Sequence, residues 1–492
     1  MKRDFSDFVS IQLNKTVNEP LYVQLYQQIE NLIKKRALSP GYALPPIRQF
    51  AGYLSINPST VVSAYKELEK NGYLFSRTGS GSYVAELPEI IDLETPSFPV
   101  DIDVPDPEIL PCSENYSGIN MSAISLNPDI VSVETFKQLM IEILDRDQGH
   151  AFSYQESQGF QPLRESIAAY LQENGVHTPE KNVQIISGAQ QGIDIAARAL
   201  LQHGDCVFVE SPTYPGALAA FRSRGAKIID IPLEEDGIAI DELEAMLRTF
   251  RPRLLYLMPN IQNPTGISYS IKKRNRLMGL ARYYHVYILE DDYISELTYE
   301  KNVPAPLKAL DRDDRVIYLK SFSKIFMPGL RLGFLTMPAK LAPGLLSVKH
   351  LSDISTSGLT QRIFDLYLRR KVWQNHIASI RQIYQTQFDF TWNAAKKYLP
   401  ETCRITPPQG GLSLWVELPP EISANALCLE LEQQGVCITN GRAFFPRQAP
   451  DRYIRISYAT ISLQQIQTGM RLLGSLLQAH AEKNPPPASP QK

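Results

Sequence analysis

Six short apolar runs, separated by helical or turn-forming stretches, dominate the middle of the chain. They lie at 183–186, 206–209, 227–231, 254–258, 286–289 and 316–319. Amphipathic stretches at 189–201 and 271–284 have helical spacing. Near-continuous apolar strands that alternate with helices are typical of a mostly parallel sheet buried on both faces. The sequence therefore predicts an α/β domain that binds its ligands at the carboxyl ends of the strands.

Charge is distributed unevenly along the 492 residues. Residues 1–84 contain ten Lys and Arg against six Asp and Glu, whereas residues 85–115 contain nine acidic residues, six prolines and no Lys or Arg. A basic module suits an anionic partner, and an acidic, proline-rich stretch packs poorly and repels itself. We therefore expect a small basic domain over 1–84, a linker over 85–115, the main body over 116–480 and a disordered tail over 481–492.

Two helical segments joined by a short turn lie in the basic domain. The first spans 45–54, and the second has Asn57 as its expected N-cap, begins with Pro58 and ends at Gly72. One side of the second helix is expected to hold Val62, Tyr65, Leu68 and Glu69, and the opposite side Ser59, Ser63, Lys66 and Lys70. Such a division is typical of a helix-turn-helix, whose second helix enters the major groove of double-stranded DNA.

A predicted hairpin follows this pair of helices. Its strands are expected at 73–77 and 82–85, around the turn Thr78-Gly79-Ser80-Gly81. A hairpin here would be a β-wing that brings Arg77 and the turn amides to phosphates or to the minor groove. The alternative is a small helical bundle with a hairpin cap that binds no DNA.

A lysine-bearing turn, Ser321-Phe322-Ser323-Lys324, follows the last apolar run, and Arg331 comes seven residues after the lysine. A desolvated lysine can lose its proton and attack an aldehyde, and an arginine fork suits a phosphate dianion. Together they suit pyridoxal 5'-phosphate (PLP), which needs a Schiff base at one end and an anion site at the other. The alternative is a solvated lysine on an ordinary turn.

Four further turns at strand ends carry side chains suited to the same group. The helix start at 187–190 offers free amides to an anion, and Tyr214 can lie flat against a planar ring. Asn263 can hydrogen-bond a ring oxygen, and Asp291 can keep a pyridine nitrogen protonated. Each turn alone also has an ordinary structural explanation, but the joint pattern is far more specific than its parts.

The basic domain resembles the winged helix-turn-helix domain of GntR-type regulators, over about 18–85. The matching segments are L-P-x-x-R (Leu44, Pro45, Arg48), N-x-x-T-V (Asn57, Thr60, Val61), A-Y-x-x-L-E and the closing G-x-G-S-Y-V. Pro46 departs from this pattern, because a serine is usual there. The body resembles the fold-type I aminotransferases, with a large part over about 150–345 and a small part over about 346–480. The whole chain, from about 18 to 480, is similar to the MocR subgroup of GntR regulators.

This resemblance implies a role for each residue of a PLP site. Lys324 carries PLP as a Schiff base, Asp291 pairs with the pyridine nitrogen, and these two act in catalysis together with Tyr293. Tyr293 and Asn263 bond the phenolic oxygen of the ring, and Tyr214 stacks on the ring. The phosphate is held by Ser187, Gly188, Ala189, Gln190, Ser321 and Arg331.

The resemblance also implies contacts outside this group of residues. Tyr154 reaches the cofactor of the partner subunit, which implies a homodimer. Arg455 grips a substrate carboxylate, and Arg442 is a less favoured candidate for that role. The residues expected to contact DNA are Arg48, Ser59, Thr60, Ser63, Lys66 and Arg77.

Two functions are compatible with these features. The first is a PLP-dependent transcriptional regulator whose aminotransferase-like domain senses an amino compound or PLP itself, and the basic domain favours it. The second is a working aminotransferase with an appended DNA-binding domain. A DNA-binding protein that uses the body only as a dimerisation scaffold is a weaker third, because a scaffold does not need Lys324 and its partners.

The remaining composition points to a cytoplasmic protein. The five cysteines fit no disulfide or zinc spacing, so we expect a reducing compartment and unpaired thiols. The seven histidines show no metal spacing, and no metal site is expected. Residues 1–10 do not read as a signal peptide, and no apolar run approaches the ~20 residues of a membrane span.

Overall fold

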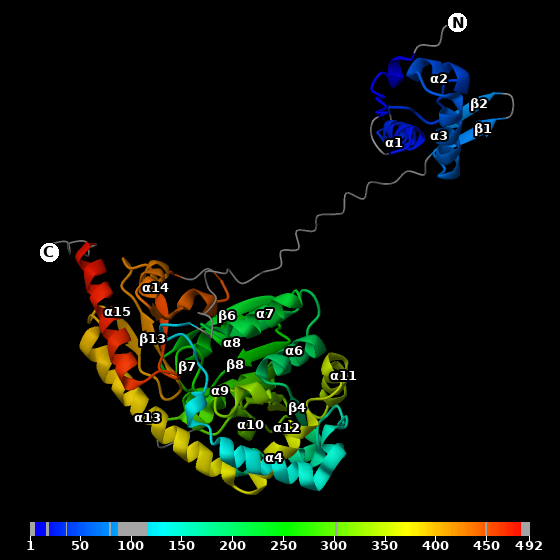
Figure 1. Cartoon of the computed structure of the whole chain (residues 1–492). Helices are drawn as coiled ribbons and strands as arrows, with labels where there is room; N and C mark the ends of the chain where they lie inside the picture. Colours follow the sequence, from blue (N-terminus) through cyan, green and yellow to red (C-terminus); the bar gives the residue numbers. More distant parts are fainter. Residues whose placement is uncertain are drawn as a thin grey trace. The chain divides into compact units, whose positions relative to one another are not determined.

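The computed structural model describes residues 5–15, 19–35, 37–77, 80–86, 116–300, 304–447 and 450–483. The chain forms two units, Met1–Ile102 and Asp103–Lys492, and each is described by itself (Figure 1). Most of the expected linker, from residue 87 to 115, lies outside the described residues. The expected tail begins too early, because α15 (Leu463–Lys483) continues three residues into it.

The N-terminal unit has three α-helices and a two-stranded antiparallel hairpin among its described residues. They are α1 (Leu21–Lys34), α2 (Ile47–Leu54), α3 (Pro58–Lys70), β1 (Leu74–Arg77) and β2 (Gly81–Val84). The carboxamide oxygen of Asn57 accepts a hydrogen bond from the backbone N–H of Ser59 at 2.9 Å, so Asn57 caps α3 as expected. Two turn residues, Thr78 and Gly79, lie outside the described residues.

The buried face of α3 differs slightly from the expected one. Its buried residues are Val61, Ala64, Tyr65 and Leu68, whereas Val62 is only partly buried and Glu69 is exposed. Tyr65 sets this orientation, because its hydroxyl donates to the carbonyl oxygen of Pro45 at 3.0 Å in the interior. The opposite, exposed face still holds Ser59, Ser63, Lys66 and Lys70.

The segment that precedes α1 completes the core of this unit. Phe8, at the end of the short helix η1 (Ser6–Phe8), is 1% exposed and packs against Phe50 with ring centroids 4.9 Å apart. Ile11 is also buried, and the Tyr42 hydroxyl donates to the carboxylate of Asp7 at 2.6 Å. Residues 5–14 therefore belong to the folded unit.

An eight-stranded sheet organises the larger unit, in the order β4-β11-β10-β9-β8-β5-β6-β7. Its strands are β4 (Val183–Ile186), β5 (Cys206–Ser211), β6 (Lys227–Glu234), β7 (Gly237–Ile238), β8 (Leu254–Leu257), β9 (Tyr287–Asp292), β10 (Val316–Ser321) and β11 (Gly333–Thr336). The pairs β10–β9, β9–β8, β8–β5 and β5–β6 are parallel, and β11 and β7 run antiparallel to their neighbours. The predicted mostly parallel sheet is confirmed, with two short strands that the apolar pattern did not reveal.

Helices surround this sheet and connect it to a smaller C-terminal part (Figure 1). They are α4 (Val133–Asp147), α5 (Gln161–Glu173), α6 (Ala189–Leu200), α7 (Pro215–Ser223), α8 (Ile240–Thr249), α9 (Ile271–Tyr283), α10 (Leu307–Leu310), α11 (Ala342–Asp353), α12 (Gly358–Arg369), α13 (Val372–Tyr398), α14 (Ala424–Gln433) and α15. The 27-residue α13 leads from the large sheet to the C-terminal part and packs along α15.

The C-terminal part contains a second, four-stranded antiparallel sheet. Its order is β12 (Arg404–Thr406), β13 (Ser413–Glu417), β16 (Tyr453–Ser457) and β15 (Thr439–Asn440). A separate parallel pair joins β3 (Ile119–Asn120) to β14 (Val436–Cys437). Since β3 precedes the whole large sheet in the chain, this pair ties the start of the larger unit to its C-terminal part.

Two observations bear on the expectations from composition. Cys206, Cys403 and Cys428 are free thiols, but Cys437 is disulfide-bonded, which contradicts the expectation that no cysteine pairs. The spacing could not reveal this, because disulfides join residues that the fold brings together and not residues near in sequence. Across the described ranges, no helix is long and apolar enough to cross a membrane.

Candidate functional site

The turn between β4 and α6 has the geometry of an anion site. Gly188 precedes α6 with a φ of 100°, a conformation that favours glycine. The Arg331 guanidinium donates to the carbonyl oxygen of Ser187 at 2.8 Å, and a Cβ on Gly188 would lie 2.5 Å from that guanidinium. The first amides of α6 and the Arg331 charge therefore lie at one place, and both favour an anion.

The other residues expected at the phosphate lie around this turn. Ala189 begins α6, and the Gln190 side chain donates to the carbonyl oxygen of Gly216 at 2.8 Å, just after Tyr214. Ser321 is the last residue of β10 and is 3% exposed. Lys324 is partly buried, in the turn that follows.

Asp291 lies at the end of β9, which runs parallel to β10 with Asp291 opposite Leu319. One carboxylate oxygen of Asp291 accepts a hydrogen bond from the Tyr256 hydroxyl at 2.7 Å. The other, Oδ1, is buried and has no hydrogen-bond partner among the described residues. Burial raises the pKa of Asp291 to about 7, against the effect of the Tyr256 hydrogen bond. A buried carboxylate oxygen without a partner is costly, so this geometry suits a ligand that brings a proton or a positive charge.

Tyr214 and Tyr293 belong to the same electrostatic environment. Burial raises the pKa of Tyr214, and the charges of Asp291, Arg331 and Arg455 all act on its phenol. Burial also raises the pKa of Tyr293, and Arg455 and Asp291 act on it as well. These mutual effects indicate that the ends of β5 and β9, the Arg331 turn and β16 converge on one site.

Arg455 projects from β16 into this site and is 6% exposed. Its guanidinium donates to the Asn263 side-chain oxygen at 3.3 Å and to the carbonyl oxygen of Ser122 at 3.1 Å. Its Nε is buried and has no partner among the described residues, and burial lowers its pKa to about 10. The aromatic ring of Phe444 lies 4.9 Å from the guanidinium. A desolvated, incompletely paired guanidinium is suited to a carboxylate ligand.

Two expected residues lie apart from this convergence. Tyr154 is 87% exposed and lines a cavity of about 290 Å³, together with Phe152, Thr356 and Gly358. Arg442 is exposed in the short helix η8 (Gly441–Phe444). The structure thus brings neither side chain into the site of its own protomer.

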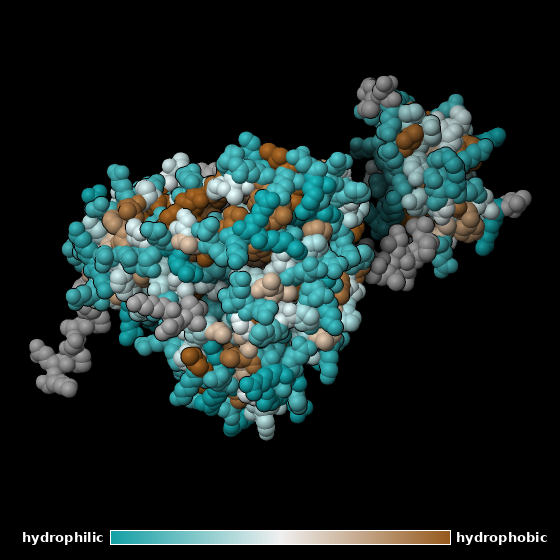
Figure 2. Space-filling model, turned by 90° about the horizontal axis from the view of Figure 1, so that it is seen from below, coloured by the Kyte–Doolittle hydropathy of each residue, from teal (hydrophilic) through white to brown (hydrophobic). Residues whose placement is uncertain are grey.

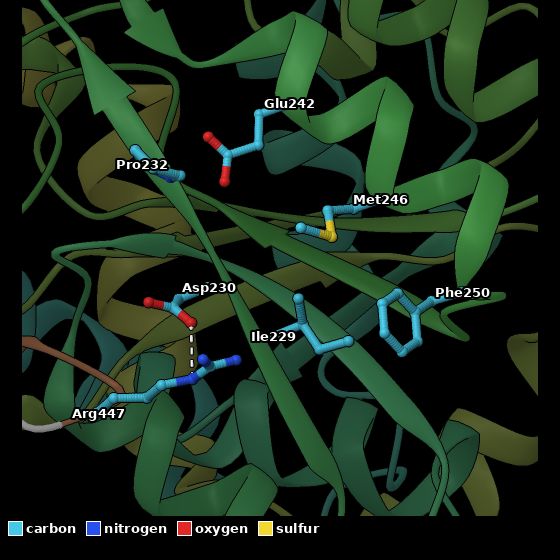
Figure 3. Close-up of a pocket in the computed structure, with 7 residues that line it drawn as sticks. All are labelled: Ile229, Asp230, Pro232, Glu242, Met246, Phe250 and Arg447. Carbon is cyan, nitrogen blue, oxygen red and sulfur yellow. Dashed lines mark ion pairs between the residues drawn. The ribbon is translucent and has the colours of Figure 1, made fainter.

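The end of η8 and the segment that follows it connect the C-terminal part to the large sheet. The backbone N–H of Thr213 donates to the carbonyl oxygen of Phe444 at 2.7 Å, next to Tyr214. Arg447 forms an ion pair with Asp230 of β6 at 3.1 Å, in a pocket of about 290 Å³ lined also by Met246 and Phe250 (Figure 3). Residues 444–447 therefore connect the turn that carries Tyr214 to the sheet that carries Arg455.

The residues expected to contact DNA lie on the surface of the N-terminal unit. Arg48, Ser59, Ser63, Lys66 and Arg77 are exposed, and Thr60 is partly buried. The Arg77 guanidinium lies 5.4 Å from the ring of Phe75 and 5.6 Å from that of Tyr83 on the paired strand. These rings hold the arginine at the turn end of the hairpin.

Three residues of the larger site were absent from the sequence-based expectations. Tyr256 donates to Asp291, Phe444 covers Arg455, and Gln191 accepts a hydrogen bond from the Ser187 N–H at 2.7 Å. Gln191 follows Gln190 at the start of α6 and could have been noticed there. Tyr256 lies inside an apolar run and Phe444 lies far away in sequence, so neither gave a signal.

Comparisons with known proteins agree with both units. The model of the family "Aminotransferase class I and II" matches residues 123–473, and that of "Bacterial regulatory proteins, gntR family" matches residues 21–84. An uncharacterized HTH-type transcriptional regulator of Bacillus subtilis, YdfD, is 30% identical over 474 residues, which cover 94% of this chain and 98% of that protein. The chain belongs to the MocR subgroup of GntR-type regulators.

Two further similar proteins, one a regulator and one an aminotransferase, correspond to the two kinds of domain in this MocR-type protein. The probable rhizopine catabolism regulatory protein MocR of Rhizobium meliloti is 27% identical over 480 residues, 94% of this chain and 95% of that protein. The crystal structure of Pyrococcus horikoshii kynurenine aminotransferase in complex with PMP is 30% identical, with a TM-score of 0.72 over 74% of this chain and 92% of that one.

The residues of this MocR-type protein fit the cofactor of its family. PLP has a ring nitrogen that becomes cationic when protonated, and the partnerless Asp291 Oδ1 is a suitable acceptor for it. PLP also has a phosphate dianion, and the amides after Gly188 together with Arg331 suit that group. The donor set therefore agrees with PLP at both of its ends.

Proposed function

We propose that this protein is a PLP-dependent transcriptional regulator. It binds double-stranded promoter DNA through α3 and the hairpin, and its aminotransferase-like domain responds to an amino compound or to PLP itself. One observation carries this proposal: a single chain joins a helix with an exposed polar face, Ser59 to Lys70, to a site built around the buried Asp291 Oδ1, which has no hydrogen-bond partner among the described residues. Such a regulator acts where its promoter is, which places it in the cytoplasm.

Different residues of the larger unit bind different parts of the cofactor and of the ligand. When bound, PLP supplies an aldehyde carbon for amines and a ring that withdraws electrons. Lys324 holds the aldehyde end, Asp291 keeps a proton on the ring nitrogen, and Arg331 and the α6 amides hold the phosphate. Tyr214 covers the ring, and Tyr293 and Asn263 donate to its phenolic oxygen. Arg455 orients a ligand through its carboxylate.

A ligand can change DNA binding only if it favours one arrangement of the protein over another. Lys324 would hold the aldehyde end of the cofactor, and a ligand amine would compete with the lysine for that end. A carboxylate on the same ligand would pair with Arg455, which is linked through Phe444 to the turn that carries Tyr214. The proposed signal begins with this combined change at Lys324 and Arg455.

The active form is proposed to be a homodimer. Exposed apolar side chains lie on α4, on η4 (Gln148–Phe152) and its following turn, and at the end of α11: Val133, Ile141, Phe152, Tyr154, Leu351 and Ile354. Figure 2 views the chain from below, the side on which α4 lies in Figure 1, and hydrophobic side chains gather on part of that face. Covering this apolar face with a second copy would bury it and bring Tyr154 to the partner's cofactor.

A working aminotransferase is the second candidate function. The specific observation in its favour is Arg455, whose buried and incompletely paired guanidinium would serve amino-acid turnover as well as sensing. Its contact with Asn263 and its electrostatic effect on Tyr293 also support this second function. Weak transamination is therefore also compatible with a regulator.

The deciding experiment measures turnover and DNA binding on the same PLP-loaded, full-length protein. We would supply a panel of amino acids with 2-oxoglutarate, and record oxo-acid formation and the visible spectrum. A regulator should show a spectral change with one ligand, little turnover, and a change in promoter affinity with that ligand. Sustained turnover of ~1 per second or more, with promoter affinity unchanged, would establish the enzyme instead.

A further inference from the structure

A fully buried lysine lies behind the active-site sheet, four residues before Lys324. Lys320 of β10 is 0% exposed. Its ammonium group lies 2.9 Å from the carboxylate of Asp292 and 2.6 Å from that of Glu296, and it donates to the Ser295 hydroxyl at 3.1 Å. The binding roles proposed above use none of these four side chains.

Both carboxylates around Lys320 have further donors. Asp292 accepts from the Tyr318 hydroxyl at 2.6 Å and from the Ser295 hydroxyl at 2.8 Å, and Glu296 accepts from the Tyr170 hydroxyl at 2.5 Å. Burial opposes ionisation of Asp292, but Lys320 and the hydrogen bonds outweigh it and hold its pKa below the ordinary value. In turn, burial disfavours the Lys320 cation, but Asp292 and Glu296 keep its pKa raised. The cluster therefore contains one cation between two anions.

Stability alone is a weak explanation for such a cluster. A buried ion pair is costly to desolvate, and well-packed apolar residues of similar volume often give equal or greater stability. The position of the cluster suggests another reason for it. Lys320 pairs in register with Asp292, next to the pairing of Leu319 with Asp291. The ion pair therefore joins the two strand ends that lead to Asp291 and Tyr293 on one side and to Ser321 and Lys324 on the other.

The cluster also acts on the site through its charge. The Asp292 anion favours the protonated form of Asp291, and the Lys320 cation favours the ionised form. Several other titratable or charged groups face the two aspartates and Lys320. They are Tyr256 of β8, Glu290 of β9, Tyr318 of β10, Tyr170 of α5, Arg274 of α9, and Tyr293 and Glu296 in the segment after β9. Among the described residues that contact Lys320 directly, only Asp292 and Glu296 can carry a charge opposite to its own.

We propose that Lys320, Asp292 and Glu296 are positioning residues of the cofactor site, which hold the ends of β9 and β10 together and set the charge behind Asp291. This inference rests on the proposed binding of PLP at Lys324. It predicts that changes of charge behind the sheet will alter the protonation of the bound cofactor, although none of the three residues lies on the Asp291 side of β9.

The test is a pH titration of the visible absorbance of PLP bound to the full-length protein. Lys320→Met removes a positive charge and should stabilise the protonated form of the PLP–Lys324 linkage, so the midpoint should rise. Asp292→Asn and Glu296→Gln each remove a negative charge and should lower it. Shifts of about one pH unit are expected, the size of the effect of one charge at ~10 Å with an effective dielectric constant of ~20.

Lys273→Met is the matched control. Lys273 is 7% exposed and pairs with Glu234 and Asp236 at 2.5 and 2.7 Å, but it lies on α9, outside the cluster. This variant should lose thermal stability without moving the midpoint. Shifts of opposite sign for the lysine and the carboxylate variants would support the proposal, because a loss of packing has no reason to depend on the sign of the removed charge.

Unchanged midpoints, or shifts of one sign in all three variants, would overturn the proposal. If Lys320→Met does not fold, the two carboxylate variants still decide, because both must lower the midpoint. A wild-type protein that shows no visible band with PLP would instead refute the proposed function, so the two failures are distinguishable.

Discussion

Asp291 and Asp292 are neighbours in β9, but their carboxylates serve opposite faces of the sheet: Tyr256 donates to Asp291 at 2.7 Å, and Tyr318 donates to Asp292 at 2.6 Å. Successive side chains of a strand alternate between the two faces, so adjacent acids can have separate roles. Burial raises the pKa of Asp291 to about 7, whereas Lys320 and hydrogen bonds outweigh burial and hold the pKa of Asp292 low. Asp291 therefore has an oxygen available for a ligand, whereas Asp292 is already paired with the Lys320 cation.

Asp291 should make the PLP-free protein less stable as the pH rises. Its folded pKa of about 7 lies above the unfolded value of ~4, so its contribution is favourable below pH ~4 and is lost as the pH rises to about 7. In Asp291→Asn this loss should be absent, with an effect on the order of a few kcal/mol, since one pKa unit is worth about 1.4 kcal/mol. Urea unfolding of both proteins at pH 5 and pH 8 measures the difference. An equal pH dependence would show that Asp291 is not the group responsible.

Lys324→Ala should remove the visible band of bound PLP and leave the fold intact, because the lysine is only partly buried in a turn. Absorbance after gel filtration measures the first effect, and circular dichroism measures the second. Lys320→Ala is not an adequate control, because Lys320 is fully buried and paired with two carboxylates; Lys340→Ala, which changes an exposed lysine, is the better one. A visible band that survives in Lys324→Ala would mean that another amine holds the cofactor.

Arg455→Lys should weaken the binding of a carboxylate-bearing amine by tenfold or more and leave PLP affinity nearly unchanged, because a lysine cannot reproduce the two-pronged guanidinium contact. Spectral titration of the PLP-loaded protein with the ligand measures this effect. Arg442→Lys provides the comparison, since Arg442 is exposed and should have little effect. The opposite ranking of the two variants would transfer the carboxylate role to Arg442.

Lys66→Ala should weaken binding to all DNA sequences alike and reduce the slope of log affinity against log salt by about one, as expected for the loss of one phosphate contact. Lys70→Ala is the matched control on the same helix, because its ammonium group already pairs with Glu67 at 3.0 Å. Binding isotherms at several salt concentrations provide the measurement. If Lys66→Ala altered the preference at only one base pair, Lys66 would read a base and not a phosphate.

Leu351→Asp should yield a monomer with reduced PLP affinity, since Leu351 is 74% exposed in the apolar set of the proposed dimer face. Sedimentation velocity reports the oligomeric state. Leu429→Asp alters a leucine of comparable character, 50% exposed on α14, and should leave that state unchanged. A monomeric wild-type protein, or a Leu351→Asp dimer, would argue against this face.

The sequence predicted the strands that are buried on both faces, and the predicted bounds lie within a few residues of the observed ones. A short uninterrupted apolar run between turns is typical of such a strand. The sequence missed β11 (Gly333–Thr336), which is short and follows directly after the Arg331 turn. The core-facing side that it predicted for α3 is shifted by about one residue from the observed one. Tertiary packing decides which side of a helix is buried, here through the Tyr65 contact with Pro45.

The contacts of the candidate site were also predictable only in part. Side chains at strand ends, such as Asp291 and Asn263, were predictable because the carboxyl ends of parallel strands meet at one edge of the sheet. The pairing of Lys320 with Asp292 was not predictable, because it depends on the register of two strands 28 residues apart in the chain. The exposure of Tyr154 likewise becomes visible only when the single protomer is folded.

The burial of Phe8 and Ile11 has a practical consequence for exchanging parts between regulators of this type. Both residues precede the segment 21–84 that the family model recognises, yet they fill the interior of the N-terminal unit. A chimera joined at residue 20 would inherit the helices without these two side chains, and would have holes where their rings and methyl groups belong. A transplant that keeps its DNA affinity should therefore begin no later than Phe5.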